Sequence, residues 1–310
     1  MHFTGTIWRP PYEADSLLLE AAAGCTHRKC KFCTLYNDLP FKFKMSSMED
    51  MEADLLEIQT ALCDPVAQLT FRLTGNHQFK TDRVFLTGAN PFGLSFERLS
   101  QIADLIRKYL PFIKSVGSFA RITDISSKSD SQLQSLSEMG FDMLTIGAET
   151  CDDSALAFMN KGYAQTDILK ECRRLEAAGI RYSLFYLAGI SGAGKGVTGA
   201  KATAEILNCL SPALVGINML TVYPDSLLFD DIQKGAWQEE SELEKYREIK
   251  ALAEGLEIKT CIAAMGASNA FQFSAYLPQD KEKLIAYLDD IISHTTEEQL
   301  AKYRKGVHHL

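Results

Sequence analysis

Short apolar runs alternate with amphipathic helical patterns along most of the chain. Each run is bounded by glycine or polar residues and is rich in aliphatic or aromatic side chains, as buried parallel strands are. The expected strands are residues 16–23, 83–87, 115–120, 143–147, 181–187 and 214–220. Parallel strands require crossover connections, which are usually helices. The pattern therefore predicts an α/β fold and favours a barrel or partial barrel over an open sheet.

Helical signals lie between these runs. Residues 46–49 (Ser-Ser-Met-Glu) have the form of a capping box and predict a helix running toward Leu62. Apolar positions spaced for one helix face recur at Leu99, Ile102, Ile106 and Tyr109, and again at Leu284, Leu288 and Ile291.

The chain after about residue 250 differs from the preceding repeats. It offers one extended segment (258–263), a loop and a helix from Asp280. We therefore predict a core domain over residues 1–250, with an N-terminal extension, and an appendage over 251–310 that completes or covers the barrel. Residues 64–80 form a polar insertion whose pattern predicts neither helix nor strand.

Composition and charge limit which cellular compartment and which kinds of binding partner we expect. The 310 residues are 46% hydrophobic and 23% charged, and the formal net charge is -8. No run reaches the roughly 20 apolar residues of a membrane span, and the N-terminus lacks the pattern of a signal peptide. We expect a cytoplasmic protein with no membrane association. Because proteins that grip nucleic acids usually present a basic surface, a small molecule or a protein segment is the expected partner.

Three of the eight cysteines, Cys25, Cys30 and Cys33, lie within nine residues after the first expected strand. In a reducing compartment such cysteines favour metal binding over disulfides. One interpretation is a zinc site with His27 or a distant residue as fourth ligand. Structural zinc sites usually pair two Cys-x2-Cys knuckles, and no second knuckle occurs in the sequence. The other interpretation is an iron–sulfur cluster with one iron open to an external ligand.

The cysteine loop resembles that of the radical S-adenosylmethionine (SAM) superfamily. In that family three cysteines follow the first strand of a partial (β/α)6 barrel, and an aromatic residue such as Phe32 often precedes the last one. The commonest spacing has three residues between the first two cysteines, whereas this chain has four. The resemblance implies a partial (β/α)6 barrel with a small C-terminal appendage. It also implies one 4Fe–4S cluster held by Cys25, Cys30 and Cys33, with one open iron site that SAM chelates.

Further motifs extend the resemblance. Residues 85–91 resemble the family's Gly-Gly-Glu-Pro motif, which holds the amino group of SAM. After Gly88, however, Ala89 and Asn90 replace the second glycine and the glutamate. Asn90 retains an acceptor in its side-chain carbonyl. Arg121, at the end of the third strand, is a candidate cation for SAM. The alternatives are a tight strand-to-helix turn and a structural arginine.

Residues 146–150 and 159–162 resemble the family's Ile-Gly-x-Glu-Ser and Asn-Lys-Gly signatures. By this resemblance Glu149 lies beside SAM and Lys161 meets its carboxylate, while Gly189 and Ile190 form part of the adenine wall. The alternatives for Glu149 and Lys161 are a helix N-terminal acid and a solvated lysine. All of these motifs lie at or after strand C-terminal ends, where parallel α/β folds bind ligands.

Residues 189–196 also nearly match a phosphate-binding loop. The final position is Gly196, so the hydroxyl that would hold magnesium is missing. We therefore expect a flexible loop over the barrel mouth and not a nucleotide triphosphatase.

The resemblance implies an enzyme that reductively cleaves SAM to a 5′-deoxyadenosyl radical under anaerobic conditions. The radical abstracts hydrogen from an unidentified small-molecule or protein substrate, and a flavodoxin or ferredoxin supplies the electron. The reaction class stays open among oxidoreductase, lyase and transferase. No catalytic side chain is assigned; Asn218, Tyr223 and Asn269 are candidate substrate contacts, with structural hydrogen bonds as the alternative.

The alternative function is a non-catalytic iron–sulfur or zinc-binding protein, either a redox sensor or a scaffold, with a degenerate SAM site. The replacement by Ala89 and Asn90 is the feature that favours it.

Overall fold

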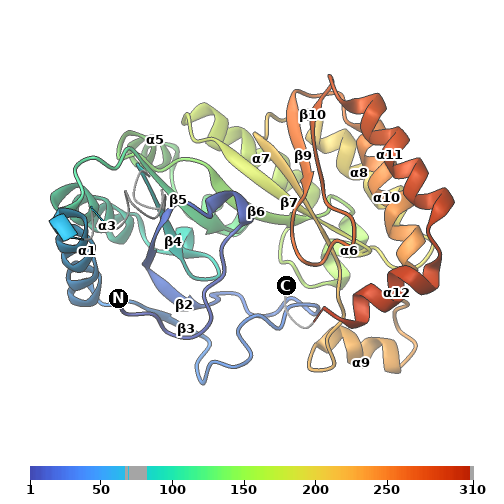
Figure 1. Ribbon diagram of the computed structural model, residues 1–310, viewed down its shortest axis with the longest axis horizontal. Coiled ribbons are helices and arrows are strands. Elements are labelled where there is room, and N and C mark those ends of the chain that lie inside the picture. The colour runs from blue at the N-terminus through green and yellow to red at the C-terminus, as the bar shows by residue number, and fades with distance from the viewer. Residues whose placement is uncertain (67–68, 70–81, 308–310) are drawn as a thin grey trace. The chain divides into compact units, whose positions relative to one another are not determined.

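The computed structural model describes residues 1–66, 69 and 82–307, which form two units (Figure 1). The first unit comprises Met1–Arg28, Leu35–Thr145 and Ala177–Ile180, and the second comprises Lys29–Thr34, Ile146–Glu176 and Arg181–Leu310. Most of the polar insertion at residues 64–80 lies outside the described residues.

The central sheet is mostly parallel and has the strand order β1-β4-β5-β6-β7-β8-β9-β10. Its strands are β1 (Leu17–Glu20), β4 (Arg83–Thr87), β5 (Ser115–Ala120), β6 (Leu144–Glu149), β7 (Tyr182–Ala188), β8 (Leu214–Met219), β9 (Thr260–Ala264) and β10 (Phe273–Leu277). Strand β10 pairs antiparallel with β9. The α/β class and the succession of parallel strands are confirmed, and the sheet is an open, partial barrel rather than a closed one.

The first expected strand is in fact divided. Residues 16–23 were expected to form one strand, but β1 ends at Glu20, and β2 (Ala22–Gly24) pairs antiparallel with β3 (Phe43–Met45) in a separate sheet. The break falls at Ala21, whose N–H donates to the carbonyl of Thr87 while its own carbonyl accepts from Ser46. The hydropathy of the side chains gives no sign that the backbone changes its hydrogen-bonding partner at Ala21, so the hydropathy pattern could not predict the break. As a result, the segment before Cys25 lies on a short two-stranded ribbon.

Helices of the first unit follow the expected pattern. They are α1 (Met48–Cys63), α3 (Phe96–Tyr109), α4 (Ile122–Ser126) and α5 (Asp130–Glu138), with short 3-10 turns η1 (Pro11–Glu13) and η2 (Pro91–Gly93). Ser47 caps α1 by accepting from the N–H of Asp50, one residue later than the expected box. Leu99, Ile102 and Ile106 of α3 are buried as predicted.

The second unit carries the remaining helices. They are α6 (Asp153–Phe158), α7 (Gln165–Ala177), which ends at the unit boundary, α8 (Gly196–Leu207), α9 (Leu227–Gln233), α10 (Glu242–Gly255), α11 (Lys281–His294) and α12 (Glu297–Lys305). Helix α10 packs between α8 and α11, beside the strands of this unit (Figure 1). Leu284, Leu288 and Ile291 of α11 are buried as predicted.

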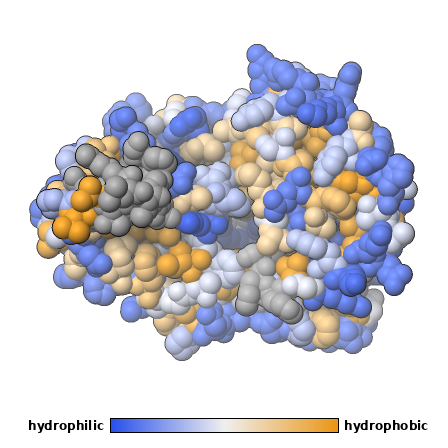
Figure 2. All heavy atoms as spheres, in the orientation of Figure 1, coloured by the Kyte–Doolittle hydropathy of each residue, from blue (hydrophilic) through white to orange (hydrophobic). Residues whose placement is uncertain are grey.

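The expected boundary after residue 250 falls inside α10, and β9 continues the parallel ladder beyond β8. The division into core and appendage stays a prediction. Among the described residues, no helix combines the length and the apolar character that a bilayer crossing demands. On the face drawn in Figure 2, hydrophilic residues are interspersed among hydrophobic ones.

Candidate cluster and cofactor site

Cys25 follows β2 directly and is anchored within the first unit. Its N–H donates to the carbonyl of Lys42 over 3.0 Å, which prolongs the β2–β3 pairing by one residue. Its sulfur accepts from the N–H of Arg28 over 3.4 Å. Arg28 itself has a φ of 47°. These two contacts fix the position of Cys25 at the end of the β2–β3 ribbon.

Cys30 and Cys33 belong to the second unit, where the segment between them is held from both sides. The N–H of Lys31 donates to Met159 over 3.1 Å, and the carbonyl of Lys31 accepts from Leu228 over 2.9 Å. The Lys31 ammonium lies 2.7 Å from the carboxylate of Asp231. This segment is therefore anchored at Lys31, and the two cysteines flank the anchor.

The donor set fits a cluster held by three thiolates. None of the eight cysteines forms a disulfide in the described structure, and Cys25, Cys30 and Cys33 are partly or fully exposed. By contrast, Cys151 is buried, and burial raises the pKa of its thiol to about 12, so that it stays protonated. Thiolates are the ligands that iron–sulfur clusters use. Within the described ranges, no three His, Cys, Asp or Glu side chains are already gathered as a metal-ligand set.

Gly88, at the turn after β4, occupies a position that only glycine fits. Its φ is 134°, and a Cβ there would lie 2.5 Å from the carbonyl oxygen of Ala22. The next residue, Ala89, donates its N–H to the carbonyl of Gly24 over 3.3 Å. The 85–91 motif thus runs directly against the residue that precedes Cys25.

Asn90 is completely buried, and its side chain joins the cysteine loop to helix α4. Its Oδ1 accepts from the N–H of Thr26 over 3.2 Å, and its Nδ2 donates to Thr26 Oγ1 over 2.7 Å and to the Asp124 carboxylate over 3.0 Å. Asp124 also accepts from the N–H of Arg121, the N-cap of α4, over 2.8 Å. Burial raises the pKa of Asp124. Contacts of Asn90 and Arg121 with SAM stay predictions.

Glu149 and the buried Lys161 form an ion pair in the second unit. Lys161 Nζ lies 3.0 Å from Glu149 Oε1 and also donates to the carbonyl of Gly147 over 3.0 Å. The ammonium lies 5.7 Å from the ring centroid of Phe32. Burial lowers the pKa of Lys161, but the charges of Glu149, Tyr163 and Cys30 outweigh it, so the pKa is raised overall. Lys161 is therefore a fixed cation near Cys30, and the solvated-lysine alternative does not describe it.

Ile190 lies in an apolar cluster beside these residues. The cluster is built on Met159, Leu187, Ile190, Leu220 and Leu228, and the rings of Phe32, Phe158 and Trp237 pack against it. Two residues assigned by resemblance, Ile190 inside this buried cluster and Phe32 packed against it, thus lie together within the second unit.

The 189–196 loop is fixed by hydrogen bonds, whereas a flexible loop was expected. Gly189 and Gly196 each donate an N–H to a buried glutamate, Glu248 and Glu240, over 2.7 Å. Gly194 donates to Glu244 over 3.3 Å. The backbone donors that a phosphate-binding loop would turn toward phosphate are here satisfied by carboxylates of the same chain.

Several residues that hold the site together do not belong to any motif recognisable in the sequence. Glu240, Glu248 and Thr26 become recognisable only through their partners, whereas Asp124 stands three residues after an N-cap position, where acids are common. Among the substrate candidates, Asn269 is buried and its Nδ2 donates to Ile217 over 3.0 Å. The roles of Asn218, Tyr223 and Asn269 stay predictions.

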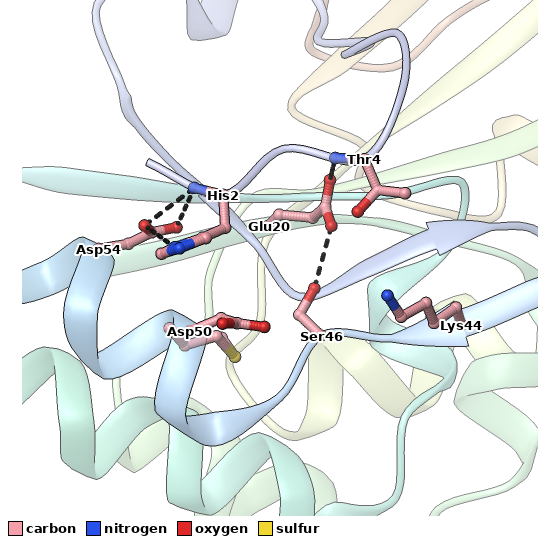
Figure 3. A pocket seen from close by; sticks show the side chains of 8 residues that line it. His2, Thr4, Glu20, Lys44, Ser46, Asp50 and Asp54 are labelled. Atoms are coloured by element: carbon pink, nitrogen blue, oxygen red, sulfur yellow. Dashed lines mark hydrogen bonds and ion pairs between the residues drawn. The ribbon is translucent and has the colours of Figure 1, made fainter.

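A small polar cavity in the first unit lies apart from these motifs (Figure 3). Its volume is about 30 Å³, close to the space that one water occupies. Glu20 accepts from the N–H of Thr4 over 2.6 Å, and Asp54 accepts from the N–H of His2 over 2.9 Å. The cavity therefore marks where the N-terminal segment is anchored to β1 and α1.

The fold and these features define a class: an α/β protein with an open, mostly parallel sheet and a three-thiol loop after its first strand. No protein-family model matches the chain. The heme chaperone HemW of Bacillus subtilis (strain 168) is 25% identical over 181 residues, which are 57% of this chain and 47% of HemW. The chain thus spans about half the length of this curated relative.

Two solved structures are similar in fold. Methylornithine synthase (PylB) has a TM-score of 0.50 and 13% identity, over 93% of this chain and 85% of that one. Coproporphyrinogen III oxidase (HemN) from Escherichia coli, described as a radical SAM enzyme, has a TM-score of 0.46 and 13% identity, over 90% of this chain and 69% of that one. The likeness to methylornithine synthase, at 13% identity, shows the fold alone.

Proposed function

We propose that the chain is a radical SAM enzyme in which Cys25, Cys30 and Cys33 hold a 4Fe–4S cluster. When bound, the cluster would supply the electron that cleaves SAM to a hydrogen-abstracting 5′-deoxyadenosyl radical. The substrate is an unidentified small molecule or protein. The electron donor is a flavodoxin or ferredoxin, and the compartment is the cytoplasm.

The observation that carries this proposal is the Glu149–Lys161 ion pair beside Phe32 and near Cys30. SAM is a zwitterion with an added sulfonium charge, so its site needs a cation and an acceptor held apart from water. Lys161 offers the cation to the carboxylate of SAM. Glu149 offers an acceptor, and Ile190 and Phe32 offer an apolar surface to the adenine ring.

A second candidate is a non-catalytic heme carrier, favoured by the sequence match to the heme chaperone HemW. In this function the three cysteines would still bind a cluster, and SAM would be held without turnover. The two candidates differ in whether 5′-deoxyadenosine forms.

The test is anaerobic reconstitution with iron and sulfide, reduction, addition of SAM and chromatography for 5′-deoxyadenosine. Cys30→Ala is the test variant, and Cys209→Ala, an exposed cysteine of the same unit, is the matched control. We expect product with the wild type and the control and none with Cys30→Ala. Iron without product, together with stoichiometric heme binding, would support the second candidate. Stoichiometric zinc with no cluster would overturn both.

A further inference from the structure

A pair of buried carboxyl groups in the second unit has no part in the proposed cluster and SAM contacts. Glu240 is 4% exposed and Glu248 is 0% exposed. Their side chains interact with each other, and Tyr186 donates its hydroxyl to Glu248. Buried carboxyl groups are rare because desolvating the charged form costs free energy. Interactions of these two glutamates must therefore offset the free-energy cost of burying them.

The two glutamates hold opposite ends of the 189–196 loop. Glu248 accepts from the N–H of Gly189, and Glu240 accepts from the N–H of Gly196, each over 2.7 Å. The loop therefore starts on one carboxyl group and ends on the other. Ile190, which we assign to the adenine wall, is the residue next to the first of these contacts.

The middle of the same loop is held by residues just before α10. Ala193 donates its N–H to the carbonyl of Gln238 over 2.9 Å. At Gly192 a Cβ would lie 2.8 Å from Nε1 of Trp237, so the indole ring packs directly on the backbone. One strip of chain, residues 237–248, thus fixes the loop at its start, middle and end.

Protonation accounts for how two carboxyl groups can be buried together. The nearby Lys245 is paired with Glu239 and Glu242, at 2.9 and 3.0 Å. Burial raises the pKa of Glu248 well above its usual value, and the neighbouring Glu240 raises it further. Burial also raises the pKa of Glu240. Burial and repulsion by the neighbouring carboxyl group thus both favour the protonated form of Glu248.

We infer that Glu240 and Glu248 are positioning residues, which clamp both ends of the 189–196 loop and so fix the backbone at Ile190 beside the proposed SAM site. The link to SAM rests on the proposed function, whereas the clamping of the loop by the two glutamates does not. The backbone donors of a loop with four glycines need fixed acceptors, because glycine loses the most conformational entropy on ordering.

The clamp is testable by fluorescence because the chain has only two tryptophans, Trp8 and Trp237. In a Trp8→Phe background the emission reports Trp237, whose ring packs on Gly192. We expect Glu248→Ala and Glu240→Ala to shift the emission to the red and to raise acrylamide quenching roughly twofold as the loop opens. Glu248→Gln supplies both an acceptor and a donor, so its emission should match the wild type.

The matched control is Glu254→Ala, an exposed glutamate at the other end of α10. Circular dichroism verifies folding, and if Glu248→Ala fails to fold, Glu240→Ala carries the test. Wild-type emission and quenching in the folded alanine variants would overturn the clamp.

The ligand assignment is tested separately, by anaerobic equilibrium dialysis of SAM with cluster-loaded protein. We expect the Kd to rise about tenfold in Glu248→Ala, and to change little in Glu248→Gln and Glu254→Ala. An open loop with an unchanged Kd would overturn the link to SAM while leaving the clamp intact. If the wild type binds no SAM, the proposed function fails, and the fluorescence result still decides the clamp.

Discussion

Lys161 Nζ lies 3.0 Å from Glu149 Oε1, and 4% of the Lys161 side chain is exposed. Glu149 reaches this position with a φ of 69°, a conformation that non-glycine residues rarely adopt. Its carboxylate folds back over Gly147, where an added Cβ would lie 2.7 Å from Oε1. Backbone strain of this kind, at a residue whose side chain forms an ion pair, is typical of ligand sites.

Replacing Lys161 should destabilise the protein even without a cofactor. Lys161→Met leaves a largely buried carboxylate without its cation, for which we expect a loss of about 3 kcal/mol in the free energy of unfolding. Lys161→Arg keeps the charge and should lose less, although its planar fork does not reproduce the ammonium geometry. Urea denaturation of the apo-protein measures both. A loss below about 1 kcal/mol in Lys161→Met would show that the pair is not desolvated.

Asn90 is neutral where the family motif has a glutamate, and Asp124 provides the reason. Asn90→Asp would place a second carboxylate beside the buried Asp124, and we expect the free energy of unfolding at pH 7 to fall by about 2 kcal/mol or more. Because burial already raises the pKa of Asp124, one carboxyl group of the variant should protonate readily, and the loss should shrink at pH 5. The double variant Asn90→Asp/Asp124→Asn should recover most of the loss. Additive losses in the double variant would contradict the contact.

Gly88→Ala should loosen the start of the cysteine loop. The substitution meets both an unfavourable φ of 134° and the carbonyl of Ala22. Gly194→Ala is the matched control, because Gly194 has a φ of 73° and no atom within 4 Å of an added Cβ. We expect the control to lose about 1 kcal/mol of stability from φ alone, and Gly88→Ala to lose more. Equal losses, measured by thermal or urea unfolding, would show that the Ala22 contact relaxes freely.

The raised pKa of Glu248 makes stability depend on pH. Because the folded state holds this proton more tightly than the unfolded chain, the contribution is complete below the usual glutamate pKa of 4.5 and is lost as pH rises through the folded pKa. Glu248→Gln does not titrate. From about pH 5 to about pH 9 the wild type should therefore lose stability relative to Glu248→Gln. Glu254→Gln is the control, and stability curves for wild type and Glu248→Gln that stay parallel would contradict the raised pKa of Glu248.

Features set by residues that are close together in the sequence could be predicted from the sequence. Alternating apolar runs predicted β4, β5, β7 and β8, because hydrophobic periodicity follows directly from strand and helix geometry. The nearness of Glu149 and Lys161 was also predictable, because the two residues lie only 12 positions apart, in matching signatures. The three cysteines lie within nine residues, so they belong to one short segment however the rest of the chain folds.

Only the tertiary structure decided which distant polar groups pair. Asn90 meets Asp124 across 34 positions, Gly196 meets Glu240 across 44, and Gly189 meets Glu248 across 59. The change of sheet at Ala21 likewise depends on Thr87 and Ser46. The sequence by itself determined the α/β class and the thiol loop, because periodicity and short spacing are local, whereas the Glu149–Lys161 ion pair emerged from the fold. The anchoring of Thr26 and of the 189–196 loop was decided by the fold, because burial makes each polar group find a partner wherever the packing places one.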